Sequence, residues 1–336
     1  MSIFVTGGAG FIGSEFIRQW VRGYPSQGVV NFDKLTYAGN LENLAAVEKH
    51  AAYKMAKGDI CDAPALAAAM PEGCDAVVHF AAESHVDRSI LSAAEFAMTN
   101  VVGTQTLLDV ARSKGVKRFL HISTDEVGGS MGEGEFFRED GPLVPSSPYA
   151  ASKAAAEHMV RAAAHTFGMD VVITRTSNNY GPYQFPEKLL PLAIGNALED
   201  RPIPVYGDGL QVRDWIHVTD NCRALMTVLG HGRSGATYHI GGNNPRTNRS
   251  VLEALLRVLE KPETLLTEVT DRLGHDRRYA VDCSRIFAEL GWRPEIRFEE
   301  GLKATARWYQ ENSGWVGRAR SGAYREYYER LYGAKP

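Results

Sequence analysis

Two pairs of reactive side chains lie in one stretch of the sequence, between residues 123 and 153. Tyr149 and Lys153 are four residues apart, a spacing that puts both side chains on one face of a helix, one turn apart. A free phenol has a pKa near about 10, and a neighbouring ammonium group lowers that value. We therefore predict that Tyr149 is a base that accompanies hydride transfer, with Lys153 as its charged neighbour.

The second pair, Asp125 and Glu126, follows the apolar run R-F-L-H-I-S at 118–123. Parallel sheets build their sites at the carboxyl ends of strands. Two close carboxylates push their pKa values apart, so that one stays protonated while the other is ionised. The pair therefore predicts an acid and a base for different atoms of one substrate, as loss of water requires. A solvated acidic turn is the alternative.

Short apolar runs alternate with helical patterns through the first half of the chain. The runs lie at 3–5, 29–32, 75–80, 118–123 and 171–175, and the helical patterns at 11–22, 62–70, 92–114 and 148–167. A serine at 146 or 147 suits the start of the last helix, with Pro148 in its first position. Continuous apolar strands between helices predict an α/β fold with a doubly wound, Rossmann-like parallel sheet.

The pattern changes after Arg175. Residues 178–186, N-N-Y-G-P-Y-Q-F-P, are rich in turn-forming and aromatic residues and predict a loop rather than a strand. Short helical and extended segments follow, which predict a smaller mixed α/β substrate-binding lobe. We expect a cofactor-binding domain over residues 1–175 and a mainly substrate-binding lobe over 176–330, with strands near 211–240 returning to the main sheet.

A glycine-rich turn, T-G-G-A-G-F-I-G at 6–13, joins the first strand to the first helix. Glycines at such a turn let the backbone approach a pyrophosphate, which the helix N-terminus attracts. Asp33 ends the second strand, where its carboxylate can accept hydrogen bonds from ribose hydroxyls and repel a 2′-phosphate. The motif therefore predicts NAD rather than NADP, and a purely structural glycine turn is the alternative. The positive nicotinamide of NAD would favour the Tyr149 phenolate together with Lys153.

The composition excludes several other classes of protein. The chain has 336 residues, a net charge of −3 and 44% hydrophobic residues. This balance supplies no basic field for nucleic acid or an anionic membrane, and no apolar stretch is long enough to span a bilayer. Four scattered cysteines without a C-x-x-C pair predict free thiols in a reducing compartment, so we expect a cytoplasmic protein with no signal peptide. We expect no metal site.

With these motifs together, the chain resembles the extended short-chain dehydrogenase/reductase family and, within it, the dTDP-glucose 4,6-dehydratases. The glycine turn and the Tyr/Lys pair are common to the superfamily. More specific are T-D-E at 124–126 and D-K-L-T-Y-A-G-N-L-E-N-L at 33–44, and further similar segments lie at 81–90, 177–189, 205–215, 271–280 and 290–294. The likeness covers roughly residues 3–310.

The resemblance implies a role for each matching residue. Thr124 and Tyr149 would bind the glucose 4-hydroxyl, Glu126 would take the C5 proton, and Asp125 would protonate the departing 6-hydroxyl. The implied cofactor residues, for a tightly bound NAD, are Gly7, Gly10, Phe11, Ile12, Gly13, Asp33, Lys34, Leu35, Thr36, Asp59, Ile60, Phe80, Ala81, Ala82, Ser84, Thr99, Tyr149, Lys153 and Asn179. The implied residues for the substrate, dTDP-glucose, are Ser84, Thr124, Asp125, Glu126, Asn178, Lys188, Leu189, Pro204, Tyr206, Arg213, Asn248, Arg272, His275 and Tyr279.

One departure from the family pattern is plain. The family usually continues T-D-E-V-Y-G, whereas here Val127 is followed by Gly128 and Gly129. An aromatic residue beside the acid pair is therefore missing, which bears on the wall of the pocket. A sugar-nucleotide epimerase of the same superfamily and a non-catalytic NAD-binding regulatory protein are the alternatives. The acid pair argues against the first, and the presence of Tyr149 and Lys153 argues against the second.

The helices expected near 92–114 and 148–167 carry broad apolar faces, and they resemble the pair that forms a four-helix dimer interface in this family. We therefore expect a homodimer, with burial inside the monomer as the alternative. The sequence leaves open whether the nucleotide base is that of dTDP or of another sugar nucleotide, such as UDP-glucose. It also leaves open which deoxysugar pathway uses the product.

Overall fold

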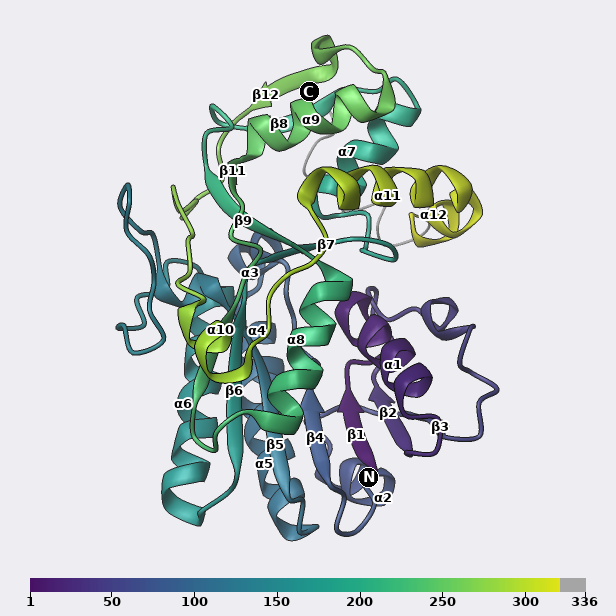
Figure 1. Ribbon diagram of the computed structural model, residues 1–336, viewed down its shortest axis with the longest axis vertical. Coiled ribbons are helices and arrows are strands. Elements are labelled where there is room, and N and C mark those ends of the chain that lie inside the picture. Colours follow the sequence, from purple (N-terminus) through teal and green to yellow (C-terminus); the bar gives the residue numbers. More distant parts are fainter. Residues whose placement is uncertain (321–336) are drawn as a thin grey trace.

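Seven parallel strands form the central sheet of the computed structural model, in which residues 1–320 are described (Figure 1). The strand order is β10-β6-β5-β4-β1-β2-β3, and the direction of winding reverses between β1 and β4. This order confirms the predicted doubly wound, Rossmann-like sheet. Its strands are β1 (Ile3–Thr6), β2 (Val29–Asp33), β3 (Tyr53–Lys57), β4 (Ala76–His79), β5 (Arg118–Thr124), β6 (Val171–Thr176) and β10 (Thr237–Ile240).

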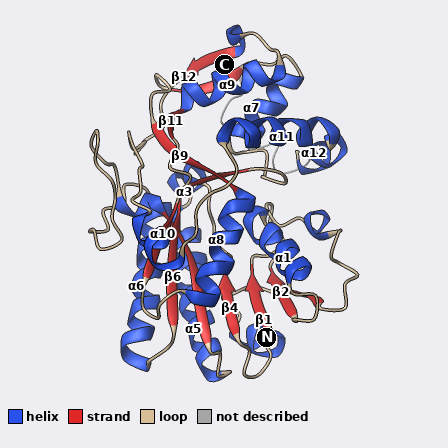
Figure 2. Ribbon diagram, viewed as in Figure 1, coloured by secondary structure: helices blue, strands red, loops and turns tan. Residues whose placement is uncertain are grey.

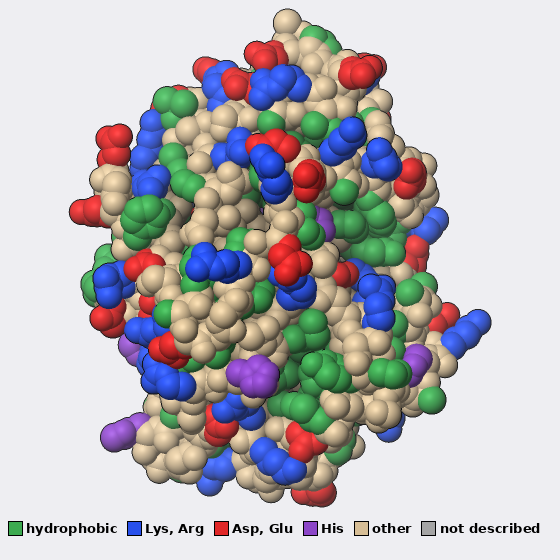
Figure 3. All heavy atoms as spheres, in the orientation of Figure 1, with side chains coloured by type: hydrophobic (Ala, Val, Ile, Leu, Met, Phe, Trp, Pro, Cys, Tyr) green, Lys and Arg blue, Asp and Glu red, His purple; other side chains and the backbone are tan. Residues whose placement is uncertain are grey.

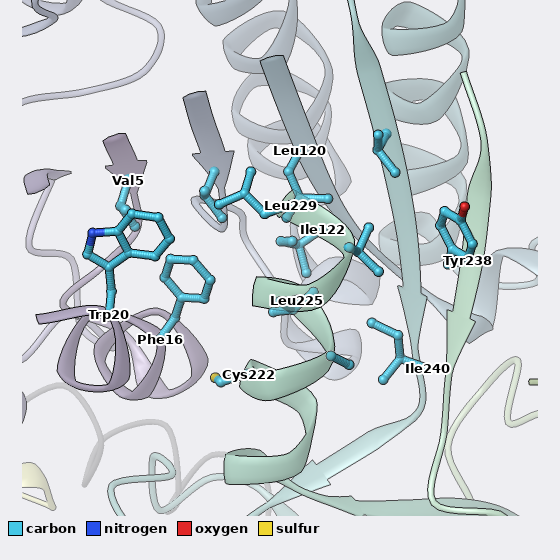
Figure 4. Close-up of a cluster of buried hydrophobic side chains, with 14 of the residues drawn as sticks. Val5, Phe16, Trp20, Leu120, Ile122, Cys222, Leu225, Leu229, Tyr238 and Ile240 are labelled. Atoms are coloured by element: carbon cyan, nitrogen blue, oxygen red, sulfur yellow. The ribbon is translucent and has the colours of Figure 1, made fainter. Parts of the chain in front are cut away.

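Helices cover both faces of this sheet (Figure 2). On one face lie α1 (Phe11–Gly23), α8 (Val218–His231) and α10 (Ser284–Leu290), and on the other α2 (Ala63–Ala69), α5 (Gly103–Ser113) and α6 (Pro148–Phe167). Figure 4 shows how Phe16 and Trp20 of α1 and Leu225 of α8 point towards the strands. Because both faces are buried, the strands read as continuous apolar runs in the sequence.

The helix expected over 92–114 is a continuous helical run that contains a π-helical turn. After α3 (Val86–Leu91), it consists of α4 (Ala93–Phe96), the π-helix η2 (Ala97–Val102) and α5. The buried Asn100 lies in η2, and its side chain bonds both the backbone N–H and the carbonyl of Glu83, each at 2.9 Å. Turns of this kind often mark functional sites, and this one reaches the segment that follows β4.

The smaller lobe lies beyond the carboxyl ends of the main strands (Figure 1). It contains a three-stranded sheet of β11 (Pro245–Thr247), β9 (Val212–His217) and β7 (Asn178–Tyr180), and a pair of β12 (Leu266–Val269) and β8 (Ile203–Tyr206). Its helices α7 (Leu189–Leu198), α9 (Asn248–Leu259), α11 (Phe298–Glu311) and α12 (Ser313–Ala319) enclose a separate hydrophobic core. Short 3₁₀ turns are η1 (Leu41–Leu44), η3 (Asp125–Gly128) and η4 (Glu263–Leu265).

One expectation about this lobe is wrong, and a second is confirmed only in part. Residues 178–180 form the strand β7 rather than part of a loop, because Asn178 pairs with Trp215 of β9, 37 positions later in the chain. Of the strands expected to return to the main sheet near 211–240, β10 does so, whereas β9 pairs with β7 and β11. Such long-range partners cannot be read from local composition.

The surface and the thiols agree with the composition. Positive and negative side chains are interspersed on the face shown in Figure 3. All four cysteines are free. Among the helices of residues 1–320, none is both long enough and apolar enough to cross a membrane.

Candidate active site

A cavity of about 340 Å³ opens at the carboxyl ends of the main strands, where the two lobes meet. Residues at or after the ends of β1, β2, β3, β4 and β5 form one wall, and the segment 176–188, at and after the end of β6, forms another. The position is the one at which doubly wound sheets bind their ligands.

The glycine turn forms the floor of the cavity at the start of α1. Gly7 has a φ of +71°, and a Cβ there would lie 2.5 Å from the backbone nitrogen of Ala81. A Cβ on Gly13 would lie 2.4 Å from the Gly7 carbonyl oxygen. Both positions therefore require glycine, and the close approach of backbone to backbone leaves a cradle that fits a pyrophosphate.

Asp33 closes the same end of the cavity. Its carboxylate accepts hydrogen bonds from the backbone N–H groups of Ala9, at 2.9 Å, and Leu35, at 2.8 Å. Burial raises the pKa of Asp33, and these two hydrogen bonds act in the opposite direction. The carboxylate thus fixes the glycine turn and keeps further lone pairs for a ribose hydroxyl.

The cavity brings together all but one of the residues implied for the cofactor. Leu35 lies outside the lining, because its main chain turns back to Asp33 with a φ of +57°. The residues that line the cavity are Gly7, Gly10, Phe11, Ile12, Gly13, Asp33, Lys34, Thr36, Asp59, Ile60, Phe80, Ala81, Ala82, Ser84, Thr99, Tyr149, Lys153 and Asn179.

Helix α6 begins as its sequence predicts and presents the Tyr/Lys pair to the cavity. The Ser147 side chain accepts a hydrogen bond from the Ala150 backbone N–H at 3.1 Å, and Pro148 is the first helical residue. Lys153 Nζ donates to the carbonyl oxygen of Ile122 at 2.6 Å. Burial lowers the pKa of Lys153 to about 8, and the carboxylate of Glu157 acts against that shift.

The pKa of Tyr149 is raised in the structure, whereas the neighbouring Lys153 was expected to lower it. Burial, followed by the charge of Glu126, raises the pKa of Tyr149 well above its usual value, and a hydrogen bond with Thr124 opposes this only in part. The physical reason is that the Lys153 ammonium is directed to the backbone of β5, while the phenol faces two carboxyl groups. Ionisation of Tyr149 therefore needs positive charge in addition to Lys153.

The acid pair lies in the turn η3, directly after β5. The Thr124 hydroxyl accepts from the Glu126 backbone N–H at 3.3 Å, which fixes the turn. Burial, and then the charge of Glu126, raises the pKa of Asp125 to about 8. Burial also raises the pKa of Glu126, whereas Arg272 and Arg213 lower it. The two carboxyl groups thus differ in their surroundings, which fits an acid next to a base.

Some of the residues implied for the substrate line the cavity, and others lie beyond it. Thr124, the acid pair and three further residues, Ser84, Asn178 and Lys188, belong to the lining, and Lys188 Nζ donates to the Ser84 carbonyl at 2.9 Å. The residues outside the lining are Leu189, Pro204, Tyr206, Arg213, Asn248, Arg272, His275 and Tyr279.

Arg213, Arg272 and Tyr279, among the outer residues, lie near enough to Glu126 for their charges to interact with its carboxylate. The Arg213 guanidinium lies 4.2 Å from the ring centre of Tyr279, and Arg272 lies 3.6 Å from the Asp87 carboxylate. The Tyr206 hydroxyl donates to the same carboxylate at 3.1 Å. Three others are elsewhere in the smaller lobe, since Leu189 begins α7, Pro204 lies in β8 and Asn248 begins α9.

Sequence reasoning missed further residues of the lining. Their shared signal is position, since they lie in the last residues of a strand, follow a strand, or belong to the turn-rich segment near 184. They are Phe32, Ala38, Gly39, Gly58, Glu83, Ile122, Ser123, Thr176, Ser177, Gln184, Phe185 and Glu187.

An aromatic ring packs against the turn that carries the acid pair, although residue 128 is glycine. A Cβ on Gly128 would lie 2.5 Å from Cδ1 of Phe137, so the ring rests directly against the glycine. Phe137 is buried and comes from the segment 129–147 that follows η3. The chain thus supplies an aromatic neighbour for the turn from another position.

A dinucleotide cradle, a Tyr/Lys pair and an adjacent carboxyl pair in one cavity define the class of extended short-chain dehydrogenases/reductases that act by transient oxidation. Residues 4–305 match the family model described as GDP-mannose 4,6 dehydratase. The sequence is 51% identical to the dTDP-glucose 4,6-dehydratase of Xanthomonas campestris pv. campestris (strain B100), covering 96% of each chain. It is 47% identical to dTDP-glucose 4,6-dehydratase 1 of Escherichia coli (strain K12), covering 99% of each.

The chain therefore belongs to the dTDP-glucose 4,6-dehydratase family. Its fold superposes on a dTDP-glucose 4,6-dehydratase from Streptomyces venezuelae, with NAD and TYD bound, with a TM-score of 0.93 at 51% identity, covering 95% of this chain and 100% of that one. A UDP-glucose 4-epimerase from Thermus thermophilus, in complex with NAD, is more distant, with a TM-score of 0.85 at 29% identity, covering 93% and 100%.

Proposed function

We propose that this protein is an NAD-dependent hydro-lyase that converts dTDP-glucose to dTDP-4-keto-6-deoxyglucose in deoxysugar biosynthesis. The observation that carries the proposal is that Thr124, Asp125, Glu126, Tyr149 and Lys153 all line one cavity together with the glycine turn. An epimerase needs the redox pair but not a carboxyl pair for loss of water. The family relationship supports the same choice.

The cavity fits NAD on grounds of its own residues. The glycine cradle would hold the pyrophosphate, and Asp33 would accept hydrogen bonds from the adenosine ribose. Asn179 lines the cavity with an Oδ1 that has no hydrogen-bond partner within residues 1–320, and such an oxygen suits an amide N–H donor. When bound, NAD would supply the hydride-transfer chemistry at C4 and C6 of the sugar and would be regenerated in each turnover.

The side chains move protons around this hydride transfer. Tyr149, aided by Thr124 and by the positive charge of Lys153 and the oxidised cofactor, takes the proton of the 4-hydroxyl. The C5 proton then becomes acidic beside the 4-ketone, and Glu126 removes it. Asp125 gives its proton to the 6-hydroxyl, which leaves as water.

The remaining proton transfers close the cycle. Glu126 returns a proton to C5 as hydride reaches C6, and Asp125 regains a proton equivalent to the one that Tyr149 accepted. The balance is the loss of one water molecule with no net oxidation. An Asp125 pKa of about 8 keeps this acid protonated at neutral pH, and the positive charges of Arg272 and Arg213 favour the ionised base at Glu126.

The outer cationic residues suit the sugar nucleotide. Lys188, Arg213 and Arg272 influence the charge of Glu126 and therefore lie near enough to meet a diphosphate close to the reacting sugar. We assign Ser84, Asn178, Tyr206, His275 and Tyr279 to the same substrate, and Leu189, Pro204 and Asn248 to its nucleotide end. We therefore propose a cofactor lobe over residues 1–175, to which α8, β10 and α10 return, and a mainly substrate-binding lobe over 176–330.

The test uses dTDP-glucose that carries deuterium at C4. Transfer of deuterium to C6 of the product, together with loss of the 6-oxygen, is the expected result. Deuterium that stays at C4, or a product that keeps its 6-hydroxyl, would favour the epimerase. Glu126→Gln is expected to retain NAD binding and C4 oxidation but to block loss of water.

A homodimer through the helical run 93–113 and α6 is part of the proposal. Met98 is 53% exposed and Val102 44% exposed, and Met159 of α6 adds a third exposed apolar side chain. Exposed apolar groups on neighbouring helices are stabilised by burial against another copy. The free thiols are consistent with a reducing compartment such as the cytoplasm.

A further inference from the structure

A series of buried contacts outside the cavity connects helix α6, which carries Tyr149 and Lys153, with the turn η3, which carries Asp125 and Glu126. It begins at Glu157 on α6, continues through Arg175 on β6 to Phe137, and ends at Gly128. The three side chains are buried, and they lie outside the cavity lining. They therefore have no direct contact with a ligand in the cavity, but they touch the elements that carry the reacting groups.

Glu157 and Arg175 form the first link. The guanidinium donates two hydrogen bonds to the carboxylate, each at 2.9 Å, and both side chains are almost completely buried. Glu157 lies one helical turn after Lys153 and two turns after Tyr149, on the same face of α6. Its negative charge opposes the effect of burial on Lys153.

Arg175 also holds the aromatic residue. Its guanidinium carbon lies 4.8 Å from the ring centre of Phe137, and its Nη1 donates to the Glu139 carbonyl at 3.3 Å. The Phe137 backbone is itself fixed, since its N–H donates to Ala280 at 2.8 Å and its carbonyl accepts from Asp282 at 2.9 Å. The ring therefore has little freedom to move.

The last link is the contact between Phe137 and Gly128, the final residue of the turn η3. The ring carbons lie 2.5 and 2.6 Å from the position that a Cβ would occupy. The φ of Gly128 is outside the left-handed region, so its backbone would accept alanine. Any cost of a side chain at this position comes from the Phe137 ring.

We propose that Glu157, Arg175 and Phe137 are positioning residues that fix the Asp125–Glu126 turn relative to Tyr149 and Lys153. With both pairs in place, the sugar that Tyr149 and Lys153 oxidise is in reach of the carboxyl groups that remove water from it. The inference rests on the proposed function, and the two ends of the assembly have different roles. Phe137 supports the elimination, and Glu157 supports the oxidation.

The Phe137 end is tested with Gly128→Ala, Phe137→Leu and the double variant. NAD-loaded enzyme is mixed with dTDP-glucose, and the absorbance of reduced nicotinamide is followed. Because displacement of reacting groups by about 1 Å costs on the order of a hundredfold in rate, we expect each single variant to accumulate reduced cofactor as elimination slows. The double variant should lose less than the product of the two single effects.

The matched control is Phe298→Leu, which removes a buried ring that also lies under a guanidinium, that of Arg246 at 4.5 Å, in the smaller lobe. This variant should accumulate no reduced cofactor. The positioning role is wrong if Phe137→Leu slows oxidation and elimination equally. It is also wrong if the loss of rate in the double variant equals the product of the losses in Phe137→Leu and Gly128→Ala. Failure of the wild-type enzyme to form a keto-deoxy sugar would instead refute the proposed function.

The Glu157 end needs a paired change, because Glu157→Gln alone leaves the buried Arg175 without its partner. The double variant Glu157→Gln/Arg175→Gln removes both charges and is expected to fold. His79 and His121 also act on Lys153, but burial lowers the pKa of both imidazoles and keeps them neutral. Arg161 pairs with Glu157 at 3.3 Å and remains in the variant. Because the charge that raises the pKa of Lys153 is that of Glu157 and not that of Arg175, removal of the pair lowers the pKa of Lys153, and the alkaline limb of single-turnover C4 oxidation shifts to lower pH. An unchanged limb in the folded variant would contradict the proposed role of Glu157.

Discussion

Replacing Asp125 by asparagine is expected to make the protein more stable while abolishing most product formation. In the folded state burial raises the pKa of Asp125 from 3.8 to about 8, so the carboxyl stays protonated at neutral pH. In the unfolded chain the same carboxyl is ionised. Folding at pH 7 must therefore take up a proton, which costs about 4 kcal/mol by linkage.

The sign of the pH dependence follows from this difference. Because the folded-state pKa is raised, the native state binds more protons between about pH 4 and 8, and stability falls by up to about 1.4 kcal/mol for each unit of pH across that interval. Asparagine has no such cost. The Oδ2 of Asp125 has no hydrogen-bond partner within residues 1–320, so the carboxamide meets a similar environment, apart from its second N–H.

We expect a net gain of about 2–3 kcal/mol at pH 7, since an unpaired N–H costs about 1–2 kcal/mol. For a chain of this size that corresponds to a rise in Tm of about 3–4 °C. The assay is differential scanning calorimetry of wild type and Asp125→Asn between pH 5 and 8, with saturating NAD. Asp140→Asn is the control, because the Asp140 side chain is 71% exposed.

The advantage of Asp125→Asn should grow with pH, whereas the effect of Asp140→Asn should stay constant. An equal or lower Tm for Asp125→Asn at pH 7, with no dependence of the difference on pH, would refute the reasoning. In that case Asp125 is ionised in the folded protein and cannot be the acid that protonates the leaving hydroxyl.

Further predictions concern the cofactor and the dimer. Gly13→Ala places a Cβ 2.4 Å from the Gly7 carbonyl and should weaken NAD binding roughly ten- to a hundredfold, whereas Gly23→Ala, with open space around it, should not; equal affinities would contradict the cradle. Asp33→Asn should reduce the preference for NAD over NADP about tenfold by removing a negative charge, and unchanged binding constants would exclude that role. Met98→Glu should shift the sedimentation coefficient towards a monomer, and the exposed Val258→Glu should not; a dimer that persists in Met98→Glu would locate the interface elsewhere.

Much of the fold could be predicted, because its evidence is local. The apolar strands, the glycine turn and the start of α6 at Ser147 each depend on residues within a few positions of one another. The strand β7 could not be predicted, because its extended conformation depends on pairing with β9 in a later part of the chain. The π-helical turn around Asn100 likewise depends on the partner that its side chain finds at Glu83.

The sequence by itself determined which reactive groups the protein has and how the nearest of them are spaced. Tyr149 and Lys153 share a helix face because of helical periodicity, and Asp125 and Glu126 are neighbours by covalent connection. The need for glycine at residues 7 and 13 was also visible. These properties need no knowledge of distant contacts.

Only the tertiary structure decided how those groups behave. Burial and the charge of Glu126 keep Asp125 protonated, and Lys153 is directed to the Ile122 carbonyl rather than to the phenol. Folding also brings Phe137 onto Gly128, which replaces an aromatic residue that the sequence had seemed to lack. The physical reason is that the pKa of a group and the shape of a pocket depend on everything packed around them, and most of those neighbours are remote in the chain.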